Sequence, residues 1–266
     1  MTPHVGLESQ VRDLTKAVRA LEAEVRELRM RTAHSLHGWG PRFAAIYDNF
    51  TDEFRGSVAD VTAKLEGYLP DVRRVAHING VVDLGSGRGE WLTLLRDAGI
   101  RSRGVDPHPR FVADGRSRGL DVEQGDAVRY LQQLPPNSVD MVTAFHLIEH
   151  LPVEELLELL EAAYNALRPG GCLLLETPNP ANLVMAACDF YNDPTHLAPL
   201  PSSLTKFLVS RQGFDDIEVR LLHPKPSPLS PARGDTEYAQ LRHLVSTALF
   251  GPQDYAVLGY KPTNAV

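Results

Sequence analysis

The apolar residues nearest the N-terminus recur at alternating steps of four and three residues. They are Leu7, Val11, Leu14, Val18, Leu21, Val25 and Leu28. Charged residues occupy many of the intervening positions, and neither glycine nor proline occurs from Val11 to Ser35. A seam with valine at heptad position a and leucine at d predicts a parallel two-stranded coiled coil and therefore a homodimer. The alternative is one amphipathic helix that packs against the rest of its own chain.

A break at residues 38–41 is followed by helical spacing of apolar residues over 43–69, which we interpret as core packing. From Ile78 onward, short apolar runs alternate with helix-like segments. The strands expected from these runs are 81–84, 104–106, 122–124, 141–145 and 172–176. The helices expected between them are 90–98, 110–117, 127–133 and 153–167. This alternation predicts an α/β fold with a doubly wound, mostly parallel sheet.

The remainder of the chain completes a sheet of seven expected strands. Residues 177–201 contain five prolines and are predicted to form a long functional loop. The elements expected after it are a helix at 203–211, a strand at 214–222, a proline-rich linker at 224–231, a helix at 237–250 and a strand at 255–260. We therefore expect three parts: a heptad helix at 1–37, a helical cover at 38–77 and the α/β domain at 78–266.

Composition excludes several classes of protein. The 266 residues include 27 Lys+Arg and 34 Asp+Glu, so the net charge of −7 disfavours nucleic acid or an anionic membrane surface as the main partner. Two cysteines are too few for a disulfide framework. No apolar run reaches the length of a spanning helix, and the first residues do not resemble a signal peptide. We expect a cytoplasmic protein without membrane insertion.

A glycine-rich turn at residues 82–90 joins the first expected strand of the α/β domain to a helix. Gly85 and Gly87 allow a tight turn and close approach of the backbone to a ligand. A dinucleotide fingerprint would place glycine or alanine where this chain has Glu90. Asp83 would also repel a pyrophosphate, whereas it would attract a cationic ligand.

Two further acids follow the next two expected strands. Asp106 lies 19 residues beyond Gly87, about where an acid accepts a hydrogen bond from a ribose hydroxyl. Asp126, followed by Ala127, is placed to accept from an exocyclic amine such as that of adenine. A nucleoside without required phosphates fits these groups, and S-adenosylmethionine is such a ligand. The alternative for each acid is a structural helix cap or turn.

These motifs together resemble the class I methyltransferases that use S-adenosylmethionine. The matching residues are Asp83-Leu84-Gly85-Ser86-Gly87, Asp106, Gly125-Asp126 and Leu167-Arg168-Pro169-Gly170-Gly171. The resemblance implies a Rossmann-like catalytic domain and contacts from Asp83, Gly85, Gly87, Asp106, Asp126 and Ala127 to the cofactor.

Ionisable residues cluster in two segments that follow expected strands. His146, Glu149 and His150 are spaced to share one face if their segment is helical, and His196 lies in the long loop. Carboxylate and imidazole ligands suit a divalent cation, for which we expect Mg²⁺ first, with Mn²⁺ or Zn²⁺ as alternatives.

The reaction expected at this cluster is methylation of a hydroxyl group. Since a sugar hydroxyl is a poor nucleophile, its methylation needs a base, a Lewis acid or both. We assign His146 as the base and Glu149, His150 and His196 as metal ligands, although the roles of His146 and His150 are exchangeable. Structural histidines and an ordinary helix start at Glu149 are the alternatives.

A wider set of matches resembles bacterial methyltransferases of sugar and polysaccharide assembly. These matches lie at residues 47–56, 68–70, 145–150, 176–182 and 193–196. Within that group the chain is most similar to mycobacterial enzymes that methylate the reducing-end 1-hydroxyl of methylmannose oligosaccharides. The resemblance implies a sugar or oligosaccharide acceptor and a contact from Arg55 to the methionine carboxylate of the cofactor.

Three other functions stay open from the sequence. One is a small-molecule or quinone O-methyltransferase, against which the polar loop 179–196 argues weakly. Another is a metal-dependent RNA ribose methyltransferase, a family that carries an acid where this chain has His146 and that the net charge disfavours. The third is a catalytically silent dimeric scaffold, which would leave the histidine and glutamate cluster unexplained.

Overall fold

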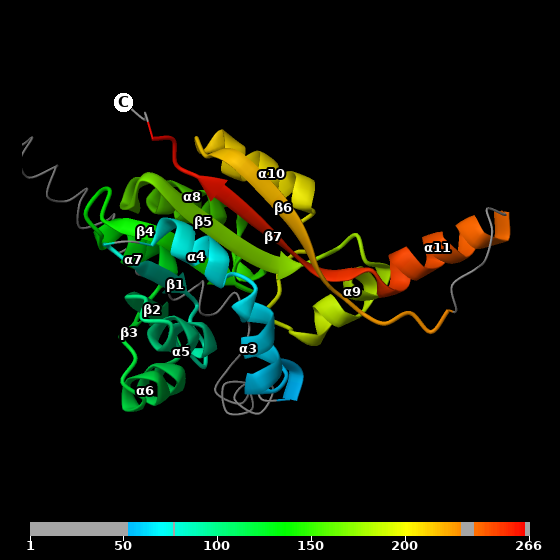
Figure 1. Cartoon of the computed structure of the whole chain (residues 1–266), viewed down its shortest axis with the longest axis horizontal. Helices are drawn as coiled ribbons and strands as arrows, with labels where there is room; N and C mark the ends of the chain where they lie inside the picture. The colour runs from blue at the N-terminus through cyan, green and yellow to red at the C-terminus, as the bar shows by residue number, and fades with distance from the viewer. Residues whose placement is uncertain (1–52, 77, 230–236, 264–266) are drawn as a thin grey trace, which may run out of the picture. The chain divides into compact units, whose positions relative to one another are not determined.

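The computed structural model describes residues 53–76, 78–229 and 237–263 (Figure 1). The chain divides into two compact units, Met1–Arg55 and Gly56–Val266. The predicted heptad helix and its coiled coil lie outside the described residues, as do residues 38–52 and 77 of the predicted cover. The fold and the site below belong to the second unit.

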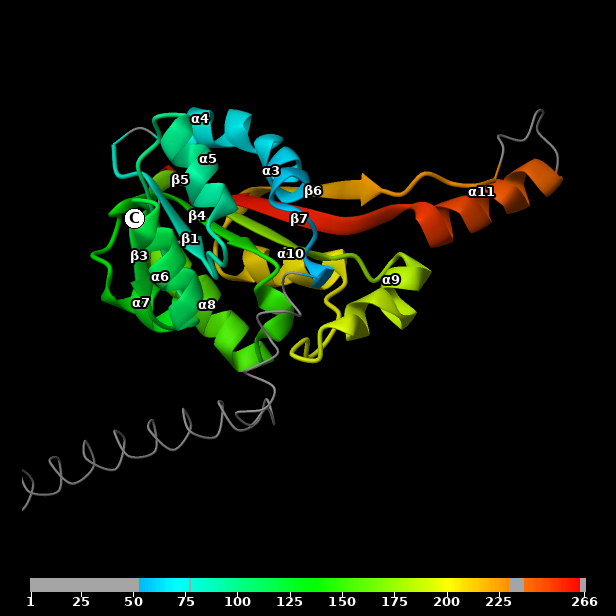
Figure 2. The same ribbon diagram turned by 90° about the horizontal axis from the view of Figure 1, so that it is seen from below.

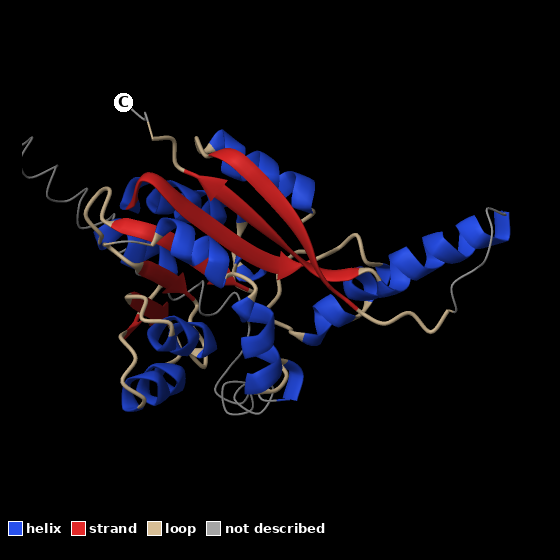
Figure 3. Cartoon of the chain, viewed as in Figure 1, coloured by secondary structure: helices blue, strands red, loops and turns tan. Residues whose placement is uncertain are grey.

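The second unit is built on one seven-stranded sheet, as the sequence predicts (Figure 3). Its strands are β1 (Val81–Leu84), β2 (Ser102–Asp106), β3 (Val122–Gln124), β4 (Val139–Phe145), β5 (Leu167–Pro178), β6 (Asp215–Pro224) and β7 (Pro252–Tyr260). They lie in the order β3-β2-β1-β4-β5-β7-β6. The pairs among β1 to β5 are parallel, whereas β7 runs antiparallel to both β5 and β6. The parallel strands therefore end at one common edge.

Helices cover both faces of the sheet (Figure 2). The helices with bounds in the described ranges are α3 (Val58–Glu66), α4 (Leu69–Val75), α5 (Glu90–Asp97), α6 (Pro109–Ser117), α7 (Ala127–Gln133), α8 (Val153–Ala166), α9 (Leu183–Ala187), α10 (Ser202–Arg211) and α11 (Glu237–Phe250). One core packs α3, α4 and α5 against the sheet, and a second packs α7, α8 and α10 against its other face. Strands covered on both sides are apolar along most of their length, which explains why their positions could be predicted.

The helical stretch expected over 43–69 is interrupted within its described part. Gly56 has φ of +87°, and Ser57 then caps α3 by accepting a hydrogen bond from the Asp60 amide at 3.1 Å. A further helix, α4, begins at Leu69, with Pro70 in its first turn. The prediction of one helix was wrong here because Gly56, Gly67 and Pro70 divide the segment.

The long loop expected over 177–201 also contains short helices. Asn182 caps α9 by accepting from the backbone amides of Val184 and Met185, and a 3₁₀ helix follows at Asp189–Asn192. The stretch therefore has more regular structure than its prolines indicated.

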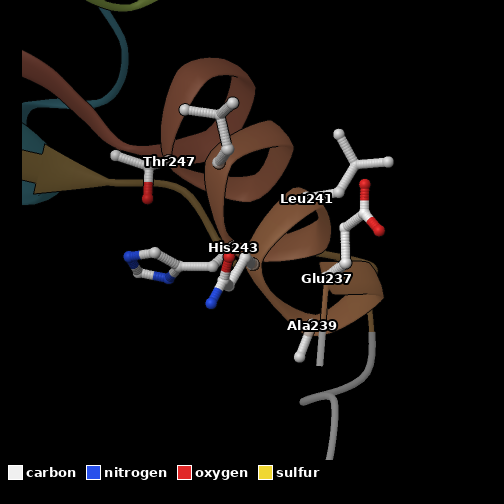
Figure 4. Close-up of a pocket in the computed structure, with 7 residues that line it drawn as sticks. Glu237, Ala239, Leu241, His243 and Thr247 are labelled. Atoms are coloured by element: carbon white, nitrogen blue, oxygen red, sulfur yellow. The ribbon is translucent and has the colours of Figure 1, made fainter. Parts of the chain in front are cut away.

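Helix α11 extends from the β6–β7 end of the sheet beside α9 (Figures 1 and 2). None of its residues is buried, and Tyr238, Leu241 and Leu244 are exposed. A surface hollow on this helix is lined by residues of α11 alone, among them Glu237 and His243 (Figure 4). Across the described ranges, no helix combines the length and apolar character needed to cross a membrane.

Candidate active site

The glycine-rich turn lies between β1 and α5, next to the segment that carries the predicted reactive residues. Gly85 and Gly87 have φ of +67° and +52°, a region that favours glycine. A Cβ added to Gly85 would lie 3.3 Å from Leu147 Cδ1, so there is little room for any side chain. Asp83 is buried in β1 and accepts a hydrogen bond from Thr143 Oγ1 at 2.7 Å.

The other two predicted cofactor acids also serve the local structure. Asp106 accepts from the backbone amide of Gly87 at 2.7 Å and from that of His108 at 2.8 Å, which ties the end of β2 to the glycine turn. Asp126 caps α7, whose first residue is Ala127, and accepts from the Arg129 amide at 2.9 Å.

The three acids thus lie on the neighbouring strands β1, β2 and β3 or directly after them. Their charge and the absence of a side chain at Gly85 fit a cationic nucleoside. Arg55 belongs to the first unit, and the structure does not place it relative to this site.

Glu149, His150 and His196 come together as predicted. Each offers one ligand atom, and these atoms all lie within 4.8 Å of one another. Glu149 and His150 belong to a 3₁₀ helix after β4, whereas His196 comes from the stretch between β5 and α10. The two imidazole rings have centroids 4.6 Å apart.

Hydrogen bonds that the two imidazoles donate to neighbouring residues fix which ring nitrogen each leaves without a proton. His196 Nδ1 donates to the Phe190 carbonyl oxygen at 2.6 Å, which leaves Nε2 without a proton in the neutral ring. Thr195 Oγ1 donates to Asp193 at 2.6 Å and therefore accepts from His150 Nδ1 at 2.9 Å. His150 also presents a bare Nε2 in its neutral form.

The carboxylate of Glu149 completes this donor set. Its Oε2 accepts from Thr177 Oγ1 at 2.8 Å, while its buried Oε1 accepts no hydrogen bond from any described residue. Although burial acts to raise it, His146 and the other two imidazoles lower the pKa of Glu149 to about 2. Burial, and then His150, lower the pKa of His196. An ionised oxygen and two imidazole nitrogens are the donors that a divalent transition cation takes.

His146 lies beside this set, but not on a helical face shared with Glu149 and His150. It has φ of +53° and follows the last residue of β4, so the condition for a shared face, a helix over the whole segment, is not met. Its Nδ1 is 3.3 Å from Glu149 Oε1, and its Nε2 is 3.6 Å from Glu176 Oε1. Asp254 Oδ1 is 3.9 Å from the same Nε2.

These surroundings favour a protonated His146. Desolvation acts to lower its pKa, but the contacts with Glu149 and Glu176 and the charge of Asp254 raise it well above the ordinary value. A base must begin the reaction without a proton. The surroundings of His146 therefore do not favour the predicted base role, which stays a prediction.

Sequence reasoning missed four residues of this edge of the sheet. They are Tyr68, which directly precedes α4, Glu176 of β5, His223 of β6 and Asp254 of β7. Tyr68 donates to Glu176 Oε2, and His223 Nδ1 lies 3.0 Å from Asp254 Oδ2. One of them, Glu176, had a signal in the sequence, because this acid directly follows the apolar run from Leu173 to Leu175.

Known proteins resemble this chain in both sequence and fold. A family model described as a methyltransferase domain matches residues 51–219. A probable S-adenosylmethionine-dependent methyltransferase of Mycolicibacterium smegmatis is 30% identical over 148 residues, which are 54% of this chain and 56% of that protein. A ubiquinone biosynthesis O-methyltransferase of Cupriavidus pinatubonensis is 34% identical over 108 residues, 37% of this chain and 41% of that protein. The chain thus spans about half the length of these curated relatives.

One solved structure matches over a longer part of the chain. It is a SAM-dependent methyltransferase from Archaeoglobus fulgidus, 32% identical, with a TM-score of 0.73. The match covers 81% of this chain and 99% of the archaeal one. The family match, this structure and the glycine turn together show that the chain belongs to the S-adenosylmethionine-dependent methyltransferases.

Proposed function

We propose that the protein is an O-methyltransferase that acts on a hydroxyl of a sugar or oligosaccharide with the help of one divalent cation. The observation that carries this proposal is the set of Glu149, His150 and His196, whose free donor atoms converge at the edge where β4 ends. The resemblance in sequence suggests the 1-hydroxyl of a mannoside as the acceptor.

The cofactor supplies a methyl group on a positively charged sulfur atom. Asp83, Asp106 and Asp126 would offset that charge and accept hydrogen bonds from the ribose and the adenine. Arg55 is the proposed partner of the methionine carboxylate. Because Gly85 packs towards Leu147, the residue after His146, the glycine turn lies next to the cation ligands.

A divalent cation held by Glu149, His150 and His196 would supply a Lewis acid that lowers the pKa of the acceptor hydroxyl. Mg²⁺ prefers oxygen ligands, whereas two imidazoles and one carboxylate suit Mn²⁺ or Zn²⁺. The donor set therefore favours Mn²⁺ or Zn²⁺ over the Mg²⁺ that we expected first.

In the proposed transfer, the acceptor oxygen attacks the methyl carbon while the carbon–sulfur bond breaks. The electron pair of that bond remains on sulfur, and the hydroxyl proton passes to water. Solvent reaches this edge, since the His146 side chain is 45% exposed. Correct placement of the two reactants accounts for much of the rate enhancement in such reactions.

A labelled-methyl assay tests the proposal. Protein treated with a chelator is supplied with labelled S-adenosylmethionine and a set of mono- and oligosaccharides, with and without Mn²⁺, Zn²⁺ or Mg²⁺. We expect label in a mannoside, with activity restored best by Mn²⁺ or Zn²⁺. Equal turnover with and without metal would contradict the role of the cation. The absence of label in every sugar tested would contradict the proposed acceptor.

Quinone methylation is the second candidate, because the ubiquinone enzyme of Cupriavidus pinatubonensis is 34% identical over 37% of this chain. A catechol-type quinone precursor therefore belongs in the same assay. Label in that compound and in no sugar would favour the second candidate.

A further inference from the structure

A second group of cation-binding side chains lies next to Glu149, His150 and His196. It consists of His146, Glu176 and Asp254, which each offer one atom within 4.8 Å of the others. Glu176 pairs with Ala256, two residues from Asp254 on the antiparallel strand β7. The two carboxylates therefore project from the same face of the sheet as diagonal neighbours.

The separations in this group suit a shared ion better than hydrogen bonds. His146 Nε2 lies 3.6 Å from Glu176 Oε1 and 3.9 Å from Asp254 Oδ1, both beyond hydrogen-bond range. Ligands held at about 2.1 Å from one ion are roughly 3–3.5 Å apart, so a small inward movement of these three atoms would accommodate one.

The far oxygen of each carboxylate already has a partner. Tyr68 donates to Glu176 Oε2, and His223 Nδ1 lies 3.0 Å from Asp254 Oδ2. The oxygens left facing His146 are Glu176 Oε1 and Asp254 Oδ1. Outer partners of this kind orient ligand carboxylates in metal sites.

The other nitrogen of His146 supports the same conclusion. An imidazole that binds a metal commonly has its second nitrogen beside a carboxylate. Glu149 Oε1 occupies that position, 3.3 Å from His146 Nδ1. Glu176 and Asp254 are 3% and 4% exposed, and two such buried carboxylates are costly unless positive charge from His146, His223 or a bound cation compensates them.

We propose that His146, Glu176 and Asp254 form a second divalent-cation site, separate from the one formed by Glu149, His150 and His196. The chemistry of its ligands, one imidazole and two carboxylates, suits Mn²⁺ or Zn²⁺. His146 is then a metal ligand rather than the base. The inference depends neither on the identity of the acceptor nor on the cation of the proposed function.

Counting bound Mn²⁺ tests the inference. Chelator-treated full-length protein is titrated with Mn²⁺, and the free ion is measured by electron paramagnetic resonance. We expect two ions for each unaltered chain, one for Asp254→Asn and one for Glu149→Gln. Asp215→Asn is the matched control, because this exposed acid lies on the same sheet in β6, and it should leave the count at two.

The pattern of losses separates this inference from the proposed function. Loss of an ion in Asp254→Asn but not in Glu149→Gln would support the second site and contradict the first. An unchanged count in Asp254→Asn would overturn the second site. Glu176→Gln repeats the measurement at the other carboxylate, and circular dichroism shows which variants remain folded. If neither variant folds, the count for the unaltered chain decides, and a single bound Mn²⁺ would overturn the inference.

Discussion

At the scale of single residues, the candidate site depends on partners that carry no charge. The Thr195 hydroxyl donates a hydrogen bond to Asp193 and accepts one from His150 Nδ1, so that Nε2 of the neutral His150 ring is available for the proposed cation. The Phe190 carbonyl accepts from His196 Nδ1 in the same way. Residue types and spacing singled out these three residues as a group but not the tautomers of the histidines, because the Phe190 carbonyl and the Thr195 hydroxyl contact the rings only in the folded chain.

Thr195→Val is expected to weaken cation binding by about 10–100-fold, as is typical for the loss of an outer partner of a ligating histidine. Valine keeps the shape of threonine but cannot accept a hydrogen bond from His150 Nδ1. Thr195→Ser keeps the hydroxyl and is the matched control. Calorimetric titration with Mn²⁺ measures both variants, and equal affinities would contradict the orienting role of Thr195.

At the scale of elements, the sequence predicted every strand of the sheet close to its observed position. Runs such as Val81–Leu84 are buried on both faces, so their composition alone identifies them. Glu176, Asp254 and His223 were missed for the opposite reason. These side chains come together because β7 pairs antiparallel with both β5 and β6, and the local periodicity of the sequence does not predict that pairing.

The glycine turn allows a test that separates strain from function. Gly85 and Gly99 both have positive φ, +67° and +72°, but only at Gly85 would a Cβ meet a neighbour. Alanine at either position should cost about 1–2 kcal/mol of stability. We expect only Gly85→Ala to weaken S-adenosylmethionine binding, by about tenfold or more, equivalent to about 1.4 kcal/mol.

Calorimetry with S-adenosylmethionine and a thermal melt measure the two effects independently. If the two variants melt at similar temperatures but differ in their affinity for S-adenosylmethionine, the cofactor binds at the glycine turn. If Gly99→Ala lost as much affinity as Gly85→Ala, the effect would come from strain alone.

Asp140 of β4 holds the segment that leads into β1. Its fully buried carboxylate accepts from the amides of Ile78, Asn79 and Gly80 at 2.8–3.0 Å and from Arg168 Nε at 2.5 Å. Asp140→Ala should lower the free energy of unfolding by about 3–5 kcal/mol, because it removes the buried partner of a charge and of three amides.

Urea unfolding measures this loss as a shift of the midpoint. The exposed Asp121 provides the matched control, and its replacement by alanine should change stability by less than about 0.5 kcal/mol. An equally small loss of stability in Asp140→Ala would mean that other interactions stabilise the segment that precedes β1.

At the scale of the whole molecule, acidic residues gather where positive ligands are expected. Three carboxylates lie on or after β1 to β3, and three more, those of Glu149, Glu176 and Asp254, surround His146. The net charge of −7 agrees with the proposed cationic cofactor, metal ions and neutral acceptor and disfavours a polyanion. The net charge alone indicated only which partners are disfavoured, whereas the fold shows where the acidic side chains lie.

The heptad pattern leads to the last prediction, which concerns assembly. Val11, Val18 and Leu21 belong to a seam that two chains can bury against each other. Lysine at Leu14 and Leu21 together should separate the dimer, because two positive charges would face their counterparts across the d positions. Lysine at Ala20 and Ala23 adds the same charge at outward positions c and f and should leave the dimer intact.

Light scattering on the full-length protein and on these two double variants measures the mass directly. We expect a dimer for the unaltered chain and the outward variant, and half that mass for the seam variant. If all three have the mass of one chain, the seam packs within its own chain. If all three are dimers, the subunits associate through another surface.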